Sequence, residues 1–168
     1  AFNISYLAMD QALSWLNERV DILNTEEGKI KTFEIREAKS LYFIDPAGNV
    51  VEFIGRQNFN KKRVKSFSEA SVLNISEVGL PVFQVSTAFH YVSESTGLDK
   101  FKDSSNTFCT VGDDEGLLML VDAAESLWYP TDEGAKEYPL QVIFSISRSK
   151  VFKLTLDYDN LEIEAYKK

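Results

Sequence analysis

The chain has 168 residues, of which 44% are hydrophobic and 12% aromatic, so it can bury a sizeable core as one domain of two lobes. Its net charge of −8 argues against nucleic acid as a partner, because phosphate binding needs a basic face. No apolar run approaches the length of a membrane span, no signal-peptide pattern opens the chain, and Cys109 is the only cysteine. We therefore expect a cytoplasmic protein without an internal disulfide, which binds neither membranes nor nucleic acid.

The first 56 residues predict a strand, a helix and three further strands. Phe2 and Ile4 alternate with small or polar neighbours, which is typical of a strand buried on one face. Apolar residues then recur at helical spacing and predict an amphipathic helix: Met9, Ala12, Leu13, Leu16 and Val20. The later strands are expected near residues 31–36, 40–45 and 50–55.

The last two of these strands flank a turn with strong sequence signals. Its proline fixes φ, Gly48 and Asn49 tolerate positive φ, and Asp45 can accept hydrogen bonds from backbone amides, so a β-hairpin is predicted. Glu52 stands out, because a carboxylate among apolar neighbours usually faces water, a partner charge or a metal. An exposed sheet face would explain Glu52 equally well.

The hairpin sequence Phe-Ile-Asp-Pro-Ala-Gly-Asn-Val-Val-Glu-Phe, residues 43–53, resembles the last hairpin of the vicinal oxygen chelate superfamily. That superfamily includes glyoxalases, extradiol dioxygenases and bleomycin-resistance proteins. The resemblance implies an α+β fold of paired βαβββ modules, which form a cupped mixed sheet with helices outside. It also implies that Glu52 is a metal ligand facing the cavity. One such scaffold serves many chemistries, including metal-free binding.

An internal repeat is consistent with paired modules. Residues 31–45 parallel residues 106–122, and residues 1–4 match residues 79–82, with a helical stretch after each of the latter two segments. The first module then covers residues 1–56, a polar linker covers 57–74 and the second module covers 75–168. The second module is expected to contain strands near 76–83, 106–112, 117–122 and 139–146, a helix from Ser86 or Thr87, and a long loop over 123–138. Two extra C-terminal strands, near 151–158 and 161–167, have no counterpart in the first module.

Strand parity selects two more candidate site residues. In the first strand of the second module, the apolar residues face the helix and leave Glu77 on the cavity side. In its predicted last strand, the same parity points Gln141 inward as the partner of Glu52. We expect Glu52, Glu77 and Gln141 to be oxygen ligands of one divalent ion (Zn, Mg, Mn or Fe), completed by a residue upstream of Ala1.

The candidate ligand-binding residues are Tyr42, Ile44, Val50, Ile54, Gln141 and Trp128. The first four would form an apolar cavity wall. Trp128, in the long loop, either covers the cavity as a lid or anchors the loop. Glu52 and Glu77 are also the candidate catalytic residues, since glyoxalase-type chemistry needs a carboxylate base beside a polarising metal. The chain departs from ring-cleaving enzymes, which use two histidines, because His90 is its only histidine and lies in a predicted helix.

Three functions stay open at this point. The first is a metal-dependent lyase or dioxygenase-like enzyme acting on a small oxygen-bearing molecule through Glu52. The second is a metal-free protein that binds or sequesters a small molecule. The third is an assembly module whose sheet edges pair with another subunit, for example in a homodimer.

Overall fold

The computed structural model describes residues 1–158 and 160–167, with every side chain in these ranges except that of residue 103. Over these residues the chain is mixed α+β, with twelve strands in three sheets and two short α-helices. The chain divides into two compact units. Unit 1 contains residues 1–78, 114–117 and 128–132, and unit 2 contains residues 79–113, 118–127 and 133–168.

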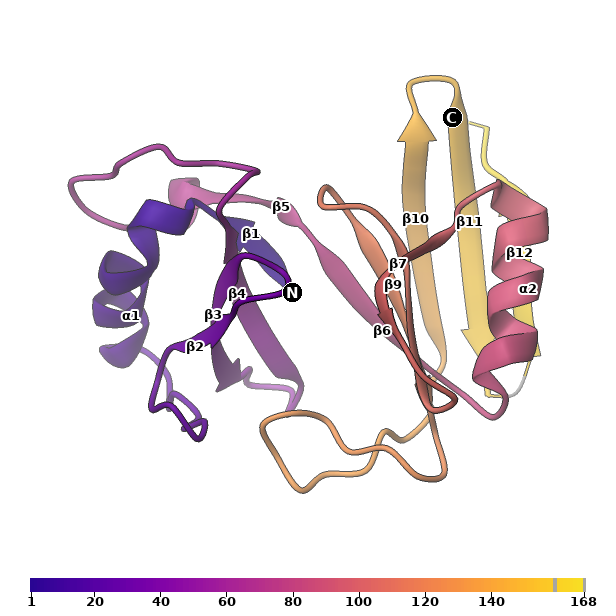
Figure 1. Cartoon of the computed structure of the whole chain (residues 1–168), viewed down its shortest axis with the longest axis horizontal. Helices are drawn as coiled ribbons and strands as arrows, with labels where there is room; N and C mark the ends of the chain where they lie inside the picture. The colour runs from indigo at the N-terminus through magenta and orange to yellow at the C-terminus, as the bar shows by residue number, and fades with distance from the viewer. Residues whose placement is uncertain (159, 168) are drawn as a thin grey trace. The chain divides into compact units, whose positions relative to one another are not determined.

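Unit 1 is a five-stranded sheet with one helix on one face (Figure 1). Its strands lie in the order β2-β3-β4-β1-β5, and β1 runs parallel to β4 while the other neighbours are antiparallel. In chain order the elements are β1 (Phe2–Ile4), η1 (Tyr6–Ala8), α1 (Met9–Asn17), β2 (Lys31–Phe33), β3 (Ala38–Ile44), β4 (Val50–Arg56), η2 (Glu69–Ser71) and β5 (Val72–Ile75).

The core of unit 1 lies between α1 and the sheet. Met9, Ala12 and Leu16 form the buried stripe of the helix, as the helical spacing predicts, and they pack with Leu41 and Phe53 of the sheet. Full burial of a Met, Leu or Phe side chain contributes about 1.5–3 kcal/mol, so this layer stabilises unit 1. The helix ends at residue 17, three residues before the end of the apolar pattern.

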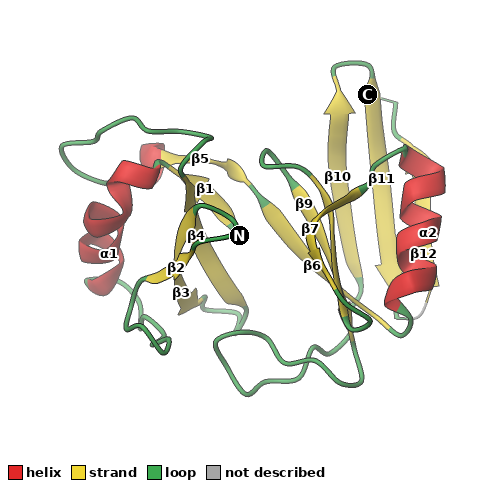
Figure 2. Ribbon diagram, viewed as in Figure 1, coloured by secondary structure: helices red, strands yellow, loops and turns green. Residues whose placement is uncertain are grey.

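Unit 2 contains two sheets and α2 (Val85–Thr96) (Figure 2). One sheet has the order β6-β9-β8-β7, and the other is the antiparallel series β10-β11-β12. The helix contacts β8 of the first sheet and β12 of the second. The strands are β6 (Glu77–Val82), β7 (Lys100–Ser104), β8 (Phe108–Gly112), β9 (Leu117–Asp122), β10 (Leu140–Ser147), β11 (Lys150–Asp157) and β12 (Asn160–Ala165).

The same strand order occurs twice along the chain. The series β1-α1-β2-β3-β4 forms the order β2-β3-β4-β1, and the series β6-α2-β7-β8-β9 forms the order β7-β8-β9-β6. The first and last strands are parallel in both. In the second series the amide of Leu117 donates to the carbonyl of Ser76 at 2.8 Å, and the amide of Ala123 donates to the carbonyl of Val82 at 3.0 Å. Both series therefore have βαβββ connectivity.

The predicted strand assignment of the second module is wrong by one strand. The strand β7 was not predicted, and the predicted last strand near 139–146 is β10, which pairs with β11 instead of joining β9. The repeat alignment of residues 31–45 with residues 106–122 is therefore also shifted by one strand. The predicted linker over 57–74 is not only a linker, because β5 adds to the sheet of unit 1 beside β1.

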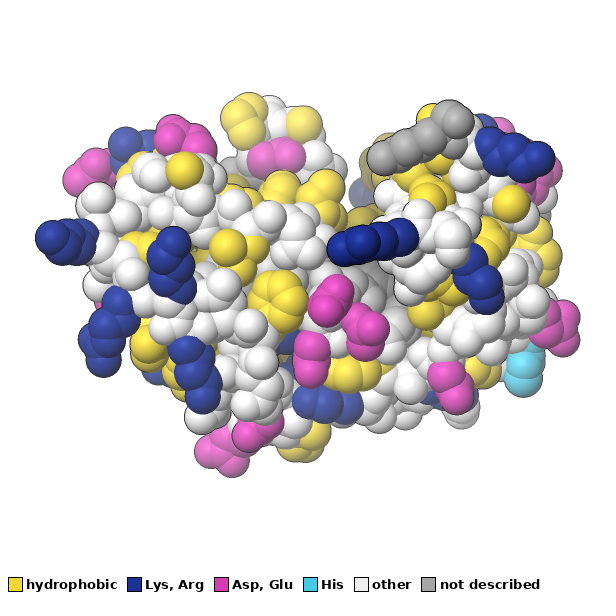
Figure 3. Space-filling model, turned by 90° about the horizontal axis from the view of Figure 1, so that it is seen from above, with side chains coloured by type: hydrophobic (Ala, Val, Ile, Leu, Met, Phe, Trp, Pro, Cys, Tyr) yellow, Lys and Arg dark blue, Asp and Glu magenta, His cyan; other side chains and the backbone are white. Residues whose placement is uncertain are grey.

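The basic run at residues 61–65 lies in an exposed loop of unit 1. Lys61, Lys62, Arg63 and Lys65 are all exposed, as expected of a solvated segment. In Figure 3, dark blue side chains are spread over the part of the surface that holds this loop. No helix within the described residues is long and apolar enough to cross a membrane.

The hairpin between β3 and β4 has the predicted turn. Gly48 adopts φ +87°, and the Asp45 carboxylate accepts hydrogen bonds from the amides of Ala47 and Asn49, both at 2.9 Å. The side chain of Asn49 donates to the same carboxylate at 2.8 Å, and these bonds lower the pKa of Asp45. The prediction of positive φ at residue 48 or 49 is confirmed.

We predict that Gly48→Ala destabilises unit 1 by about 1 kcal/mol, because a side chain at positive φ is strained even where space is free. Urea unfolding measures the change. Gly134→Ala is the matched control, since Gly134 also has open space around it but lies outside the left-handed region. Equal midpoints for the two variants would contradict the assigned turn.

Candidate functional site

The candidate site is the face of the unit 1 sheet opposite α1. Successive strand residues point to opposite faces, so Leu41 and Phe53, which pack on α1, direct their neighbours to the other side. This face carries the predicted carboxylate of Glu52 and the predicted apolar wall of Tyr42, Ile44, Val50 and Ile54. It also carries three residues that were not predicted, namely Asn3, Ser40 and Arg56.

Glu52 and Tyr42 form a hydrogen-bonded pair on this face. They lie directly opposite each other in β4 and β3, and the Tyr42 hydroxyl donates to Oε1 of Glu52 at 3.0 Å. Glu52 is partly buried and Tyr42 is 7% exposed. Burial, followed by the negative charge of Glu77, raises the pKa of Glu52 from its usual 4.5 to about 7. Burial also raises the pKa of Tyr42, with the Glu52 charge as the second cause.

Arg56 is the centre of a second, buried polar cluster beside this pair. Its Nη1 donates to Oδ1 of Asn3 and to Oγ of Ser76, both at 2.6 Å, and its Nη2 forms an ion pair with Oε1 of Glu77. Its Nε lies 3.6 Å from Oδ1 of Asp114. Both Arg56 and Glu77 are 3% exposed, so this is an internal salt bridge that joins β4 to β1 and to the start of β6.

Two buried polar atoms on this face lack a hydrogen-bond partner among the described residues. They are Nδ2 of Asn3 and Oγ of Ser40, and both residues are fully buried. The Ser40 hydroxyl is close enough to favour the ionised form of Glu52, but it makes no hydrogen bond of standard geometry. An unpaired buried group costs about 1–3 kcal/mol. The Asn3 amide is thus a donor that a bound molecule or a water would satisfy.

The predicted metal ligands are divided between the units, with Glu52 and Glu77 in unit 1 and Gln141 in unit 2. Glu52 and Glu77 interact electrostatically, but the carboxylate of Glu77 is bound by Arg56. Gln141 is exposed on β10, which alternates as predicted but joins β11 in unit 2 and not the sheet of β9, so its partnership with Glu52 stays a prediction. Within the part of the chain that the structure describes, no group of three His, Cys, Asp or Glu side chains could hold a metal ion. These residues do not fit the donor set that the resemblance implies.

The other candidate residues have structural roles or lie at the surface. Cys109 is buried in β8, where burial raises the pKa of its thiol, and His90 is exposed on α2. Trp128 is half-buried in the segment 128–132 of unit 1. Its neighbour Tyr129 holds that segment in place: the hydroxyl donates to Oε2 of Glu26 at 2.6 Å, and the ring contacts that of Tyr42. These contacts favour the anchoring role of the loop.

No protein-family model matches the chain, and no curated protein has a similar sequence. The function therefore has to be inferred from the geometry of this face.

Sequence reasoning missed Arg56 and Asn3. Arg56 points to the same side of β4 as Glu52, and Asn3 of β1 pairs with Ile54, which also points to that side. The available signal was the position of Arg56 four residues after Glu52 in the same strand, which places both on one face.

We predict that Glu52 makes the protein less stable as the pH rises from about 4.5 to about 7. In this window the carboxyl of Glu52 is protonated in the folded chain but ionised in the unfolded chain, so the unfolded state binds fewer protons and the free energy of unfolding falls with pH. The slope from one group is at most about 1.4 kcal/mol per pH unit. Urea unfolding across this range should show a component that Glu52→Gln removes and that Glu162→Gln, an exposed control in β12, retains.

We also predict that Arg56→Met destabilises unit 1 by about 3–5 kcal/mol, because it leaves Glu77 charged and buried without a partner. The double variant Arg56→Met with Glu77→Leu should recover part of this loss in urea unfolding. Lys153→Met, which breaks an exposed cross-strand pair with Glu164, should cost about 1 kcal/mol or less. A loss of similar size at residues 56 and 153 would show that the internal pair is not desolvated.

Proposed function

We propose that the chain is a protein of the vicinal oxygen chelate type that binds a small oxygen-bearing molecule on the face of unit 1 opposite α1, without a metal ion. The hairpin of residues 43–53 supports the family, and the βαβββ connectivity of residues 2–56 and 77–122 is compatible with it. Cytoplasmic localisation and a homodimer stay predictions.

The observation that carries the proposed binding role is the unpaired amide of Asn3. Its Oδ1 accepts from Arg56, so its Nδ2 is held in a fixed direction, fully buried and without a partner among the described residues. A rigid donor of this kind suits the oxygen of a carbonyl, carboxylate or hydroxyl group. The bound oxygen would remove the cost of the unpaired amide, so such a ligand is preferred over an apolar one.

The Glu52–Tyr42 pair supplies the second polar contact. With a pKa of about 7, Glu52 is present as both acid and carboxylate near neutral pH, so it can donate to or accept from the ligand. Ile44, Val50 and Ile54 surround the pair on the same face and would contact the carbon skeleton of the ligand. This arrangement favours a small molecule with two oxygen groups on a short apolar frame.

The pKa of Glu52 also favours a second candidate function, general acid–base catalysis on such a molecule. A carboxylate that titrates near neutrality is suited to remove a proton from carbon next to a carbonyl and to return it. Such proton transfer would be a glyoxalase-like reaction, with Glu52 as the base. Arg56 would hold Asn3, and Asn3 would hold the carbonyl oxygen.

The test is ligand-observed NMR with hydroxyacetone, small carboxylic acids and simple phenols as probes. We expect saturable binding of at least one class. Glu52→Gln should weaken it, and Asn3→Asp, which keeps an oxygen for Arg56 but removes the amide donor, should weaken it about fivefold. Asn74→Asp, in the neighbouring strand β5, is the matched control. Exchange of the α-proton of hydroxyacetone in D₂O, lost in Glu52→Gln, would establish the catalytic candidate.

Calorimetric titration with Zn²⁺, Mg²⁺, Mn²⁺ and Fe²⁺ separates the proposal from the metal-dependent alternative. We expect no uptake that depends on Glu52. Stoichiometric uptake that Glu52→Gln abolishes would overturn the metal-free assignment. Absence of binding by all three probe classes, or binding unchanged in both Glu52→Gln and Asn3→Asp, would overturn the proposed site.

A further inference from the structure

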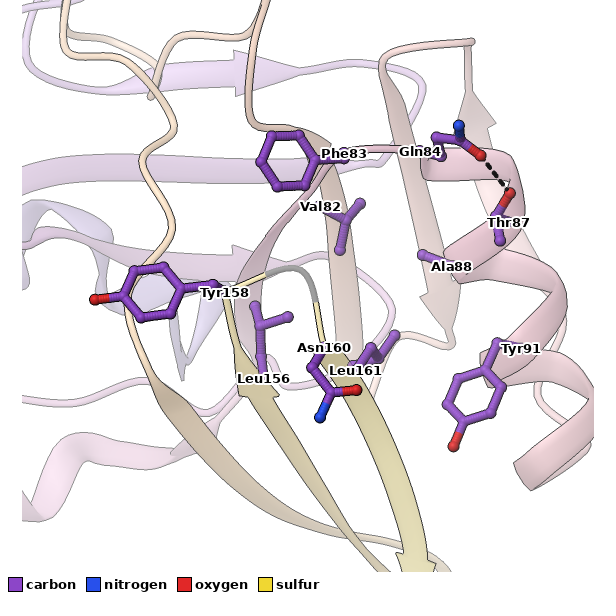
Figure 4. Close-up of a pocket in the computed structure, with 10 residues that line it drawn as sticks. All are labelled: Val82, Phe83, Gln84, Thr87, Ala88, Tyr91, Leu156, Tyr158, Asn160 and Leu161. Atoms are coloured by element: carbon purple, nitrogen blue, oxygen red, sulfur yellow. Dashed lines mark hydrogen bonds between the residues drawn. The ribbon is translucent and has the colours of Figure 1, made fainter.

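Unit 2 contains a pocket of about 550 Å³ between the start of α2, the end of β11 and the start of β12 (Figure 4). Its volume lies within the range of small-molecule sites, about 300–1,000 Å³. The ten described residues that line it belong to unit 2, and the proposed function of unit 1 uses none of them. The pocket is therefore a separate candidate site.

The base of the pocket is apolar and rigid. Val82, Ala88 and Leu156 are 5%, 8% and 1% exposed, respectively, and they come from β6, α2 and β11. Leu161 of β12 adds a half-buried side chain. Since these side chains belong to regular elements that pack on one another, the base is formed before any ligand arrives. A ligand there would contact carbon atoms and gain little from charge.

Aromatic rings border the pocket. Phe83 and Tyr158 are each 57% exposed, and Tyr91 is 38% exposed. Figure 4 shows their rings around the apolar base. Large aromatic side chains exposed to this degree around a concave apolar surface mark a binding site more often than isolated exposed residues do. A flat aromatic molecule would cover these rings by stacking or edge contacts.

Polar but uncharged groups complete the pocket. Gln84 and Thr87 are hydrogen-bonded to each other at 2.9 Å, and the Tyr91 hydroxyl accepts the amide of Ile163 at 3.2 Å, which leaves its own proton to donate. Asn160 contributes an amide. None of the ten described side chains that line the pocket is Asp, Glu, Lys, Arg or His. An ionised ligand would lose hydration without gaining a counter-charge, so the lining selects neutral molecules.

We propose that this pocket binds a neutral, flat aromatic molecule that carries a hydrogen-bond acceptor. Its rings would lie among Phe83, Tyr158 and Tyr91, and its acceptor would take the proton of the Tyr91 hydroxyl. No residue of the candidate face of unit 1 is among those that line this pocket.

The probe that tests this is N-phenyl-1-naphthylamine, a neutral aromatic dye whose fluorescence rises in apolar surroundings, titrated into the full chain. We expect saturable binding with one site per chain. Phe83→Ala and Tyr158→Ala should each weaken it about fivefold, because each removes one aromatic contact. Tyr138→Ala is the matched control: Tyr138 is 68% exposed, does not line the pocket, and its removal should leave binding unchanged.

Filling the pocket gives a second test that does not disturb the core. Thr87 lines the pocket and Ser86 does not, although both are exposed on the first turn of α2. Thr87→Trp should abolish saturable binding, and Ser86→Trp should retain it. Equal binding by both variants would overturn the site. Absence of saturable binding by the wild-type chain, or tighter binding of the anionic dye 1-anilinonaphthalene-8-sulfonate, would overturn the assignment to neutral aromatic ligands.

Discussion

The internal salt bridge between Arg56 and Glu77 is the contact on which the architecture of unit 1 depends. Transfer of two charges from water to the interior costs several kcal/mol for each ion, and only full use of the guanidinium donors offsets that cost. Asn3 and Ser76 provide the remaining acceptors, so the cluster joins β4, β1 and the start of β6. A shift of β4 by one residue would turn Arg56 toward α1 and leave all three partners without it. The ion pair thus specifies strand register as well as contributing to stability.

The two faces of the unit 1 sheet differ in composition and in their contribution to stability. The face toward α1 is apolar and closely packed, with Ile4 and Leu41 fully buried. The opposite face holds unpaired polar atoms at Asn3 and Ser40, which lower the stability. Such groups are tolerated where the rest of the unit is well packed, and they are typical of surfaces kept for binding. In this sheet the apolar face stabilises the unit, and the polar face has unpaired groups that could bind a ligand.

Local chemistry explains which features could be predicted from the sequence. The hairpin was predictable because Asp45 and Gly48 determine the turn by their own conformational preferences and hydrogen bonds. Strand parity likewise sufficed to put Tyr42 and Glu52 on one face. Both inferences need only residues that are close in sequence, and neither depends on which strands become neighbours.

The misassigned features depend on contacts between distant segments. The alternation of β10 suits any half-buried strand, and only its pairing with β11 decides its sheet, so the sheet that contains Gln141 was predicted wrongly. The strand β7 reads Lys-Phe-Lys-Asp-Ser, which has little apolar signal. Arg56 resembles an ordinary exposed arginine until Glu77, 21 residues later, is brought beside it. Tertiary pairing carries this information, and a single sequence does not.

The pKa of Glu52 near 7 gives the polar face a charge that varies with pH. Arg56 is paired with Glu77, so ionisation of Glu52 adds one negative charge to the face. Under mildly acidic conditions the face would therefore repel anionic molecules less than under mildly alkaline conditions, where neutral molecules are favoured. One partly buried carboxyl thus makes the choice of ligand depend on the acidity of the compartment in which the protein works.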